Sequence, residues 1–385
     1  MNNSLVIGLG FGDEGKGHIT SYLVSQSRNS LVCRFNGGHQ AGHTVYFGGH
    51  RHIFSSFGSG TLQNIPTFWS KFCTLYPIAL KNEYEVLRKI GIRPTLYVDP
   101  LCPITTPFDI ISNQYCESLN NHGSVGVGFG ATIERHENNH CIFAEDLFNL
   151  TVLKTKLDLL KEYYSEIYKI NSLIWDIQYQ QFLDAIEYLF TNIVIYLSDS
   201  SILKKFDIVF EGAQGIMLDQ KHGFFPHVTR SNTTSKNAME LIVENNLNIP
   251  EIYYITRTYQ TRHGNGPLSN ESIFAPPILV NNEQETNVTG EWQGKFRTGI
   301  LDLDLIDYAL TIDNLYSQSI PKDSISKNLV ITCIDQTGNL IYATKNQTIF
   351  QLEIEKIRDY LNIDFKKYYG SYGCTSETIK KIKYF

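Results

Sequence analysis

Glycines, two carboxylates and a lysine are concentrated in one segment near the N-terminus, VIGLGFGDEGKGHIT, residues 6–20. Residues 10–16 fit the first seven positions of the phosphate-binding pattern GxxxxGK, but Gly17 stands where that pattern has a Mg²⁺-binding Ser or Thr. A carboxylate in such a turn repels phosphate unless a metal ion lies between them or the carboxylate acts as a base. We therefore expect Asp13 to bind Mg²⁺ in place of the missing hydroxyl. The alternative is a solvated turn whose acidic residues favour the start of a helix.

A second glycine-rich segment, FNGGHQAGHTV, contains two histidines four residues apart, His39 and His43. The glycines around them favour a loop over a helix, which argues against a helical pair of metal ligands. A histidine in a folded protein is more often structural than catalytic. Backbone without side chains can nevertheless approach a ligand closely, so we expect His43 to face one.

Each glycine segment follows a short apolar run, as expected of a buried parallel strand that leads into a loop. SLVIGLG and SLVCRFNGG enclose a helix-like segment, and further strands are indicated by FDIVFEGAQG, IPEIYYITRTY and NLVITCID. The pattern predicts a single α/β domain over residues 1–385, with a mostly parallel central sheet flanked by helices. Its glycine loops would lie at the carboxyl ends of the strands, where such sheets bind ligands. Residues from about 145 to 205 lack glycine and proline, which predicts a helical insertion.

The composition excludes several classes of protein. Hydrophobic residues make up 42% of the 385 residues, enough for a substantial core, and a net charge of −6 gives no sign of a nucleic-acid partner. No apolar run reaches the length of a membrane span, so we expect no membrane partner. The seven cysteines are scattered without C-x-x-C spacing, which suits a reducing, cytoplasmic location.

GDEGKG followed by GGHQAGHT resembles the adenylosuccinate synthetase family. The stretches LCPITTPFD, FEGAQGIMLD, HGFFPHVTRSNTT, TRHGNGP, RTGILDLD and TCID follow in the family's order, so the resemblance runs from about residue 4 to the C-terminus. It implies a P-loop-NTPase-like fold and a GTP-dependent ligase of purine biosynthesis. In that reaction GTP phosphorylates the 6-oxygen of IMP, and L-aspartate displaces the phosphate to give adenylosuccinate, GDP and phosphate. The resemblance also implies Mg²⁺ as cofactor, GTP as co-substrate and a homodimer.

The same resemblance assigns roles to individual residues. It implies that Asp13 takes the purine N1 proton and binds Mg²⁺ together with the backbone of Gly42. It implies that His43 donates a hydrogen bond to the oxygen that gains phosphate, while Lys16 holds the GTP phosphates. The catalytic residues implied are Asp13, His43 and Lys16. Those implied to bind GTP are Gly12, Glu14, Gly15, Lys16, Gly17, Gly42, Thr44, Asp335, Ser371 and Gly373. Those implied to bind the purine nucleotide are Asp13, Gln40, Ser124, Gln214, Thr229 and His263.

Three of these matches concern recognition of the two nucleotides. Gln214 matches a glutamine that reads the purine edge, and Thr229 matches a threonine on the 5′-phosphate. Asp335 matches the carboxylate that accepts hydrogen bonds from guanine. Cys333 stands where the family's T-K-L-D motif has a lysine, but since the carboxylate remains, we expect GTP rather than ATP.

The segment that resembles the amino-acid loop departs from the family. The family's pattern is roughly T-T-G-R-x-R, and this chain has EWQGKF followed by Arg297. Lys295 stands in an arginine position, and the two cations are not interchangeable at a carboxylate site. The residues expected to bind the amino acid are Trp292, Gln293, Gly294, Lys295 and Arg297.

The segment HGSVGVGFG departs from the family's G-T-T-G-R-G-x-G. Ser124 keeps one hydroxyl, Val125 loses the other, and Val127 replaces an arginine that in the family reaches the nucleotide phosphate. A cation from elsewhere would restore the contact, and the candidates are Arg135, Lys236 and Arg230. Alternatively the substrate differs: dGMP could give 2-aminoadenylosuccinate, or another amino acid could serve. A GTPase or nucleotide-binding module without ligation is the remaining alternative, against which the retained catalytic set argues.

Overall fold

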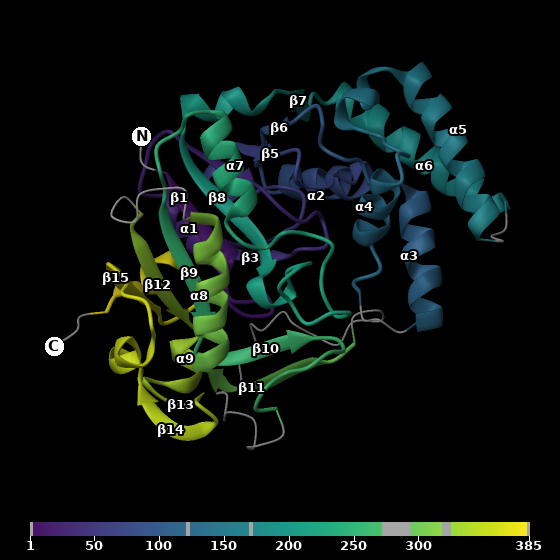
Figure 1. The fold of residues 1–385 in the computed structure, drawn as a ribbon. Helices are drawn as coiled ribbons and strands as arrows, with labels where there is room; N and C mark the ends of the chain where they lie inside the picture. Colours follow the sequence, from purple (N-terminus) through teal and green to yellow (C-terminus); the bar gives the residue numbers. More distant parts are fainter. Residues whose placement is uncertain (1–2, 121–123, 169–171, 272–293, 318–324, 383–385) are drawn as a thin grey trace.

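The computed structural model describes residues 3–120, 124–168, 172–271, 294–317 and 325–382. Its main feature is a ten-stranded sheet in the order β16-β15-β12-β9-β1-β8-β2-β5-β6-β7 (Figure 1). Neighbouring strands pair in parallel except β15 and β16. The strands are β1 Ser4–Gly8, β2 Ser30–Arg34, β5 Thr67–Trp69, β6 Leu96–Val98, β7 Ile195–Leu197, β8 Asp207–Gly215, β9 Glu251–Arg257, β12 Lys327–Thr332, β15 Lys367–Ser371 and β16 Ile379–Lys381.

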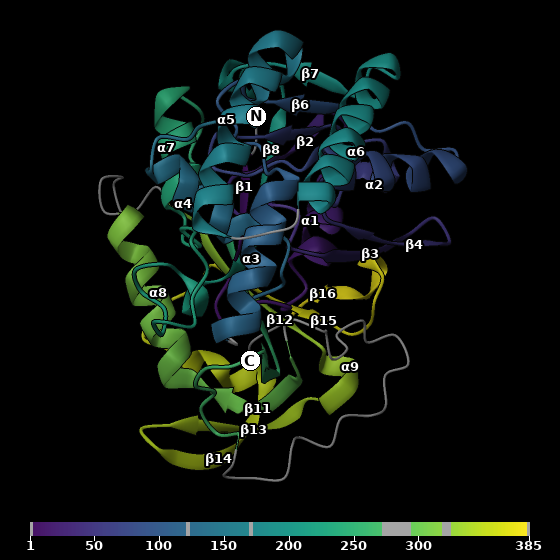
Figure 2. The same ribbon diagram turned by 90° about the vertical axis from the view of Figure 1, so that its right-hand side faces the viewer.

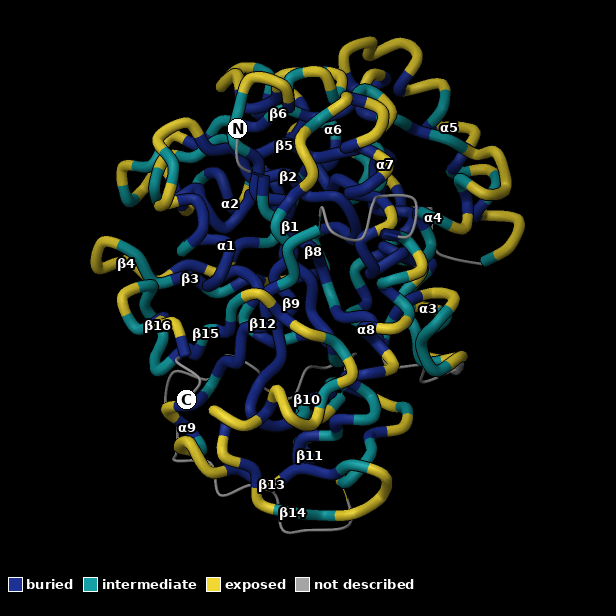
Figure 3. Tube along the Cα trace, turned by 60° about the vertical axis from the view of Figure 1, so that its left-hand side comes forward, coloured by how far each residue is buried: buried dark blue, intermediate teal, exposed yellow. Residues whose placement is uncertain are grey.

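Both faces of this sheet are covered, which explains why its central strands are continuous apolar runs rather than alternating ones. On one face, Val6 packs with Ile19 and Leu23 of α1 (Lys16–Val24). On the other, Leu5 and Ile7 belong to a larger core that includes residues of α7 (Lys236–Glu244) and α8 (Leu303–Ser317). Figure 3 shows the central strands buried, with exposed residues gathered in turns and outer helices.

A second core lies beyond β5 and is built mostly from helices. These are α2 Pro77–Lys89, α3 Pro107–Asn120, α5 Leu150–Ile167 and α6 Ser172–Thr191, while α4 (Phe129–Glu137) lies against α3. The helical segment expected over about 145–205 is therefore mainly α5 and α6. It is shorter than expected at its end, because residues 195–197 form β7 and pair in parallel with β6 at the edge of the main sheet.

A small four-stranded sheet lies beneath the carboxyl end of the main sheet, at the bottom of both Figure 1 and Figure 2. Its strands are β10 Tyr259–His263, β11 Phe296–Asp302, β13 Leu340–Lys345 and β14 Thr348–Glu353. A separate hairpin joins β3 His43–Phe47 to β4 His50–Phe54, and a short helix, α9, covers Ile334–Thr337. The 3₁₀ turns are Thr61–Gln63, Ala144–Phe148, Ser200–Lys205, Ile216–Leu218, Ile354–Tyr360 and Ser376–Thr378. Within the described ranges, no helix is both long enough and apolar enough to cross a membrane.

Candidate active site

A cavity of about 620 Å³ opens at the carboxyl ends of the central strands. The loop after β1, the start of the β3–β4 hairpin, the segment before α4, the end of β8, β10, α9 and the turn after β15 all contribute to it. This is where parallel sheets bind ligands. The cavity gathers these predicted residues: Asp13, Glu14, Gly15, Lys16, Gly17, Gln40, Gly42, His43, Thr44, Ser124, Gln214, Thr229, His263, Asp335, Ser371 and Gly373.

The first glycine loop curls around the carboxylate of Glu14, which is only 4% exposed. The backbone amides of Gly10 and Gly12 donate to Glu14 Oε1 at 2.8 and 3.2 Å, and Lys16 Nζ donates to Oε2 at 2.6 Å. A Cβ at Gly8 would collide with that carboxylate, so a side chain there would displace Glu14 from its partners. The two neighbouring carboxylates of the sequence motif therefore differ: Glu14 fills the inside of the loop, while Asp13 lines the cavity with 31% of its side chain exposed.

The backbone of this loop is held by side chains from distant strands. Asp13 has a left-handed φ of 59°, a conformation that a residue other than glycine adopts only at a cost. Arg257 Nε donates to the carbonyl of Asp13 at 2.5 Å, and Thr332 Oγ1 donates to the carbonyl of Glu14 at 2.8 Å. Arg257 was not among the residues predicted from sequence. The ends of β9 and β12 thus fix the turn that presents the Asp13 carboxylate.

His43 begins β3 and is paired with a buried carboxylate that sequence reasoning missed. Its Nδ1 lies 2.8 Å from Oε1 of Glu211, a fully buried residue of β8. Glu211 also accepts hydrogen bonds from the backbone N–H and the hydroxyl of Ser59, and Arg34 Nη1 lies 3.9 Å away. The available signal was the glutamate that follows the apolar residues IVF within FDIVFEGAQG, because a buried carboxylate requires partners.

The electrostatics of this pair indicate an ionised glutamate and a neutral imidazole. Burial alone would raise the pKa of Glu211, but His43, Arg34 and Ser59 lower it to about 2. Burial lowers the pKa of His43 despite the nearby carboxylate. A neutral imidazole that donates its Nδ1–H to Glu211 keeps an unprotonated Nε2, which is a hydrogen-bond acceptor.

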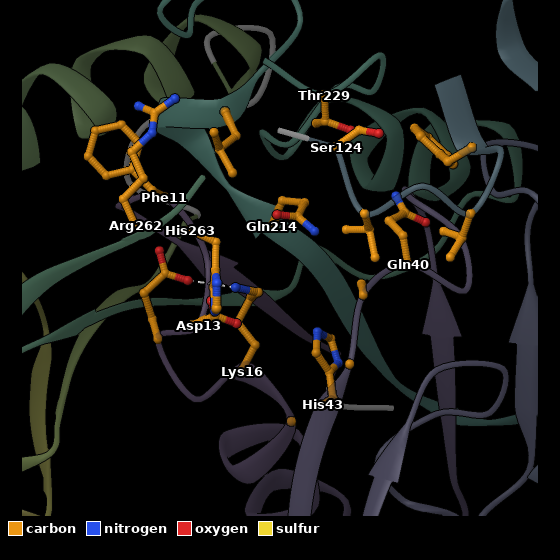
Figure 4. A pocket seen from close by; sticks show the side chains of 18 of the residues that line it. Phe11, Asp13, Lys16, Gln40, His43, Ser124, Gln214, Thr229, Arg262 and His263 are labelled. Carbon is orange, nitrogen blue, oxygen red and sulfur yellow. Dashed lines mark hydrogen bonds and ion pairs between the residues drawn. The ribbon is translucent and has the colours of Figure 1, made fainter. Parts of the chain in front are cut away.

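The carboxylate of Asp13 lies beside another histidine of the cavity, His263. His263 Nε2 lies 3.4 Å from Asp13 Oδ2, and the His263 ring contacts Phe296 with centroids 5.0 Å apart. Figure 4 shows His263 beside Asp13, with Lys16 close by, while His43 and Gln214 point into the same cavity. Gln214 itself has a left-handed φ of 62°. Acidic, basic and amide groups thus converge on one volume.

Another part of the cavity is formed by the motif expected to read a base. Asp335 is in α9, and burial raises the pKa of its carboxyl group. Cys333, Ser371 and Gly373 line the same part, and Ser371 Oγ lies 3.2 Å from Nε2 of His18. Asp13 follows β1, Asp335 follows β12 and Ser371 ends β15; β9 pairs with both β1 and β12, and β12 pairs with β15, which brings these distant segments to one edge of the sheet.

The predicted amino-acid loop is placed only in part. Trp292 and Gln293 lie outside the described residues. Gly294, Lys295 and Arg297 are described but do not line the cavity, and Gly12 likewise lies beside it rather than in its wall. Arg297 donates to Glu271 Oε2 at 2.8 Å and to the carbonyl of Gly266 at 2.7 Å. The assignment of this loop to an amino acid stays a prediction.

A parallel sheet with a glycine loop at its centre, a lysine within that loop and an imidazole across the cavity define an α/β enzyme of nucleotide-dependent phosphoryl transfer. The family model for adenylosuccinate synthetase matches residues 5–332. The chain belongs to this family of ligases, whose activity is the GTP-dependent joining of IMP and aspartate.

Curated relatives agree with this assignment. The adenylosuccinate synthetase of Buchnera aphidicola (Schizaphis graminum) is 31% identical over 377 residues, covering 92% of this chain and 85% of the relative. That of Proteus mirabilis is 32% identical over 332 residues, covering 82% and 75%. These matches confirm the resemblance inferred from the motifs.

Two solved structures share the fold. Fully ligated adenylosuccinate synthetase from Plasmodium falciparum matches with a TM-score of 0.78 and 19% identity, covering all of both chains. The succinoaminodeoxyadenylate synthetase PurZ of cyanophage S-2L, bound to dGMP and to dATP as an energy donor, matches with a TM-score of 0.67 and 16% identity, covering 99% of this chain and 95% of that one. The large, mostly parallel sheet flanked by helices is therefore confirmed.

Proposed function

We propose that this chain acts as a single-domain, cytoplasmic adenylosuccinate synthetase with Asp13, Lys16 and His43 as its catalytic residues. The γ-phosphoryl group of GTP moves to the 6-oxygen of IMP as the N1 proton leaves. The amine of aspartate then attacks carbon 6, the C–O bond breaks and inorganic phosphate departs. The observation that supports this most is that Asp13, Lys16, His43 and Gln214 line one cavity.

Asp13 is the proposed base for the N1 proton. Its carboxylate is exposed to the cavity, whereas that of Glu14 is occupied by two amides and a lysine. Lys16 is the proposed cation for the GTP phosphates. Because the ammonium of Lys16 is bound to the buried carboxylate of Glu14, we propose that Glu14 holds it in position for the nucleotide.

His43 is proposed to donate a hydrogen bond to the 6-oxygen as that oxygen gains phosphate. Since Nδ1–H is committed to Glu211, donation from Nε2 requires a second proton on the ring. The negative charge of Glu211 favours that proton, and so does the charge of an arriving phosphate. We propose that the imidazole is protonated during the transfer and that Glu211 stabilises the imidazolium.

The donor set fits a magnesium ion bound mainly through substrate phosphates. Within the described ranges no group of three or more His, Cys, Asp or Glu side chains could hold a metal ion. Mg²⁺ in nucleotide sites commonly takes only one or two protein carboxylates and keeps phosphate and water ligands. The Asp13 carboxylate and the Gly42 backbone, both in the cavity wall, are oxygen donors of that kind. Bound there, the ion would neutralise charge on the transferred phosphoryl group.

The remaining residues are proposed to recognise substrates. Asp335 would accept hydrogen bonds from guanine, with Gly12, Gly15, Gly17, Thr44, Ser371 and Gly373 around the rest of GTP. The proposed contacts to the purine nucleotide are Gln40, Ser124, Gln214, Thr229 and His263. The proposed contacts to the amino acid are Trp292, Gln293, Gly294, Lys295 and Arg297. A homodimer is proposed from the family alone.

A substrate-shifted ligase of the same chemistry is the second candidate. It is favoured by Val125 and Val127 in the cavity wall, where the family's pattern has polar groups, and by the two amide atoms of Gln40, which have no hydrogen-bond partner in the described structure. The match to PurZ, a structure with dGMP bound, is compatible with it.

A substrate panel tests both candidates. Purified protein would be incubated with GTP and Mg²⁺, with IMP, GMP or dGMP as acceptor and with aspartate or other amino acids as donor. Mass spectrometry would then identify new products, with His43→Ala as the inactive control. A product mass found only with IMP and aspartate supports the main proposal, and one found with dGMP or another amino acid supports the second. Phosphate release that needs no acceptor would overturn ligation.

A further inference from the structure

Four described Lys or Arg side chains line the cavity, and three of them are engaged within the fold. Lys16 is bound to the buried Glu14 carboxylate. Arg257 holds the carbonyl of Asp13. Arg262 donates to three backbone carbonyls, those of Asn265, Pro267 and His227. The fourth is Arg230, whose partners are of a different kind.

Arg230 directly follows Thr229 and is 45% exposed. Its Nη1 lies 3.3 Å from Glu137 Oε2 and 3.7 Å from Glu134 Oε2, both on α4. These carboxylates are 65% and 59% exposed, and ion pairs between exposed groups contribute about 0–1 kcal/mol. The guanidinium can therefore leave them for a more highly charged partner at little cost.

The cavity wall near Arg230 requires a cation if a phosphate binds there. Ser124 and Thr229 offer neutral hydroxyls, and in Figure 4 they lie together at the end of the cavity away from Asp13 and Lys16. The backbone N–H of Ser124 is bound to the carboxylate of Glu117, which is 8% exposed. A phosphate monoester carries close to two negative charges at neutral pH, so Glu117 and Glu134 would repel it unless a cation intervenes.

The other two cations considered from sequence do not reach this wall. Arg135 is 1% exposed, with Nε 2.8 Å from Asp109 Oδ1 and further hydrogen bonds to the carbonyls of Ile104 and His140. It belongs to the core between α3 and α4. Lys236 is exposed at the start of α7 and is not among the residues that line the cavity.

We propose that Arg230 binds the 5′-phosphate of the acceptor nucleotide, exchanging Glu134 and Glu137 for the phosphate oxygens. This rests on the proposed function, in which the acceptor is a purine nucleotide. The planar guanidinium offers two parallel N–H donors that match phosphate oxygens, which a lysine would not. Arg230 thereby makes the site selective for a nucleotide over a nucleoside.

The test compares IMP with inosine, which lacks the phosphate, by titration calorimetry. Arg230→Gln should weaken IMP binding roughly 10- to 100-fold, the effect of losing one charge-assisted contact, and should leave inosine binding unchanged. Lys236→Gln, the matched control, should change neither. The double variant Glu134→Gln/Glu137→Gln should tighten IMP binding, because Arg230 then has no carboxylate to leave.

Two results would overturn the inference while leaving the proposed function intact. One is wild-type binding of IMP that Arg230→Gln does not weaken more than Lys236→Gln does. The other is an equal loss for IMP and inosine, which would show that the variant disturbs the pocket rather than the phosphate contact. If the wild-type protein neither binds IMP nor forms a product with it, the proposed function fails first.

Discussion

Replacing Glu211 by glutamine tests the buried pair that orients His43. Glutamine keeps the shape of the side chain and removes its charge. The variant leaves the guanidinium of Arg34 buried without a carboxylate, since Glu211 is its only ion-pair partner in the described structure and its nitrogens make no hydrogen bond there. It also removes the charge that we propose stabilises the protonated ring of His43.

The size of the effect follows from the pKa of Glu211. A value lowered from 4.5 to about 2 means that folding stabilises the ionised form by about 3 kcal/mol at neutral pH. This contribution is present above pH 4.5 and is lost as the pH falls towards 2, because the unfolded chain then binds the proton more readily. Glu211→Gln should therefore lose about 3 kcal/mol of stability at pH 7, while kcat should fall roughly 10²-fold. Ordinary domains have about 5–15 kcal/mol, so the variant should remain folded.

Urea unfolding at pH 7 measures the loss of stability. Steady-state kinetics at pH 7 without urea measure the fall in kcat. The matched control is Asp109→Asn, which breaks another fully buried arginine–carboxylate pair, Asp109 with Arg135, outside the catalytic set. It should also destabilise the protein by several kcal/mol, but kcat of the folded enzyme should stay within about threefold of wild type. The reasoning is refuted if Glu211→Gln unfolds at the wild-type urea concentration, or if its kcat falls no further than that of Asp109→Asn.

Three further predictions address the other residues of the site. Asp13→Asn and His43→Ala should each lower kcat by roughly 10²–10⁴-fold, and calorimetry should show that His43→Ala still binds GTP; turnover near the wild-type rate in either variant would contradict the proposed roles. Asp335→Asn should raise the KM for GTP roughly 10- to 100-fold and reduce the preference for GTP over ATP, since one acceptor for guanine is lost; an unchanged GTP/ATP ratio would count against base reading by this carboxylate. Burial lowers the pKa of His18 to about 4 from 6.5, so protonation favours the unfolded chain below pH 6.5 and stability should drop by about 2 kcal/mol between pH 7 and 5. The urea midpoint of His18→Gln should therefore depend less on pH than that of the wild type. An identical pH dependence would refute the lowered pKa of His18.

The parts of this structure that could be predicted from sequence are those where residue type leaves little choice. Short apolar runs that lead into a loop are typical of buried strands, and several of them here end in glycines, so the sequence predicts β1, β2, β8, β9 and β12. Three-residue strands such as β7 carry too little pattern, and the sequence predicts that Ile195–Leu197 belongs to the end of a helical insertion. Edge pairing with β6, not local propensity, makes this segment a strand.

Within the site, residue types could be predicted but their orientation could not. Asp13 and Glu14 are neighbours of the same chemical type, and nothing in GDEGKG says that one faces the cavity while the other binds the loop's own amides. The difference follows from the positive φ values of Gly12, Asp13 and Gly15. Glu211 was visible as a charge in an apolar strand, but its partner His43 is 168 residues away in sequence.

The same geometry explains how a loop with two carboxylates can serve a phosphate. Glu14 neutralises Lys16 and accepts hydrogen bonds from the amides of Gly10 and Gly12, so these three donors of the loop are paired within the fold. Arg257 and Thr332 anchor the carbonyls of the turn. We propose that these anchors keep the Asp13 carboxylate directed into the cavity while Lys16 exchanges Glu14 for phosphate. In the proposed mechanism, phosphate binding moves the Lys16 side chain away from Glu14. Positioned charges accelerate phosphoryl transfer when the fold holds them in place, and we propose that the Asp13 carboxylate and the Lys16 ammonium act in this way.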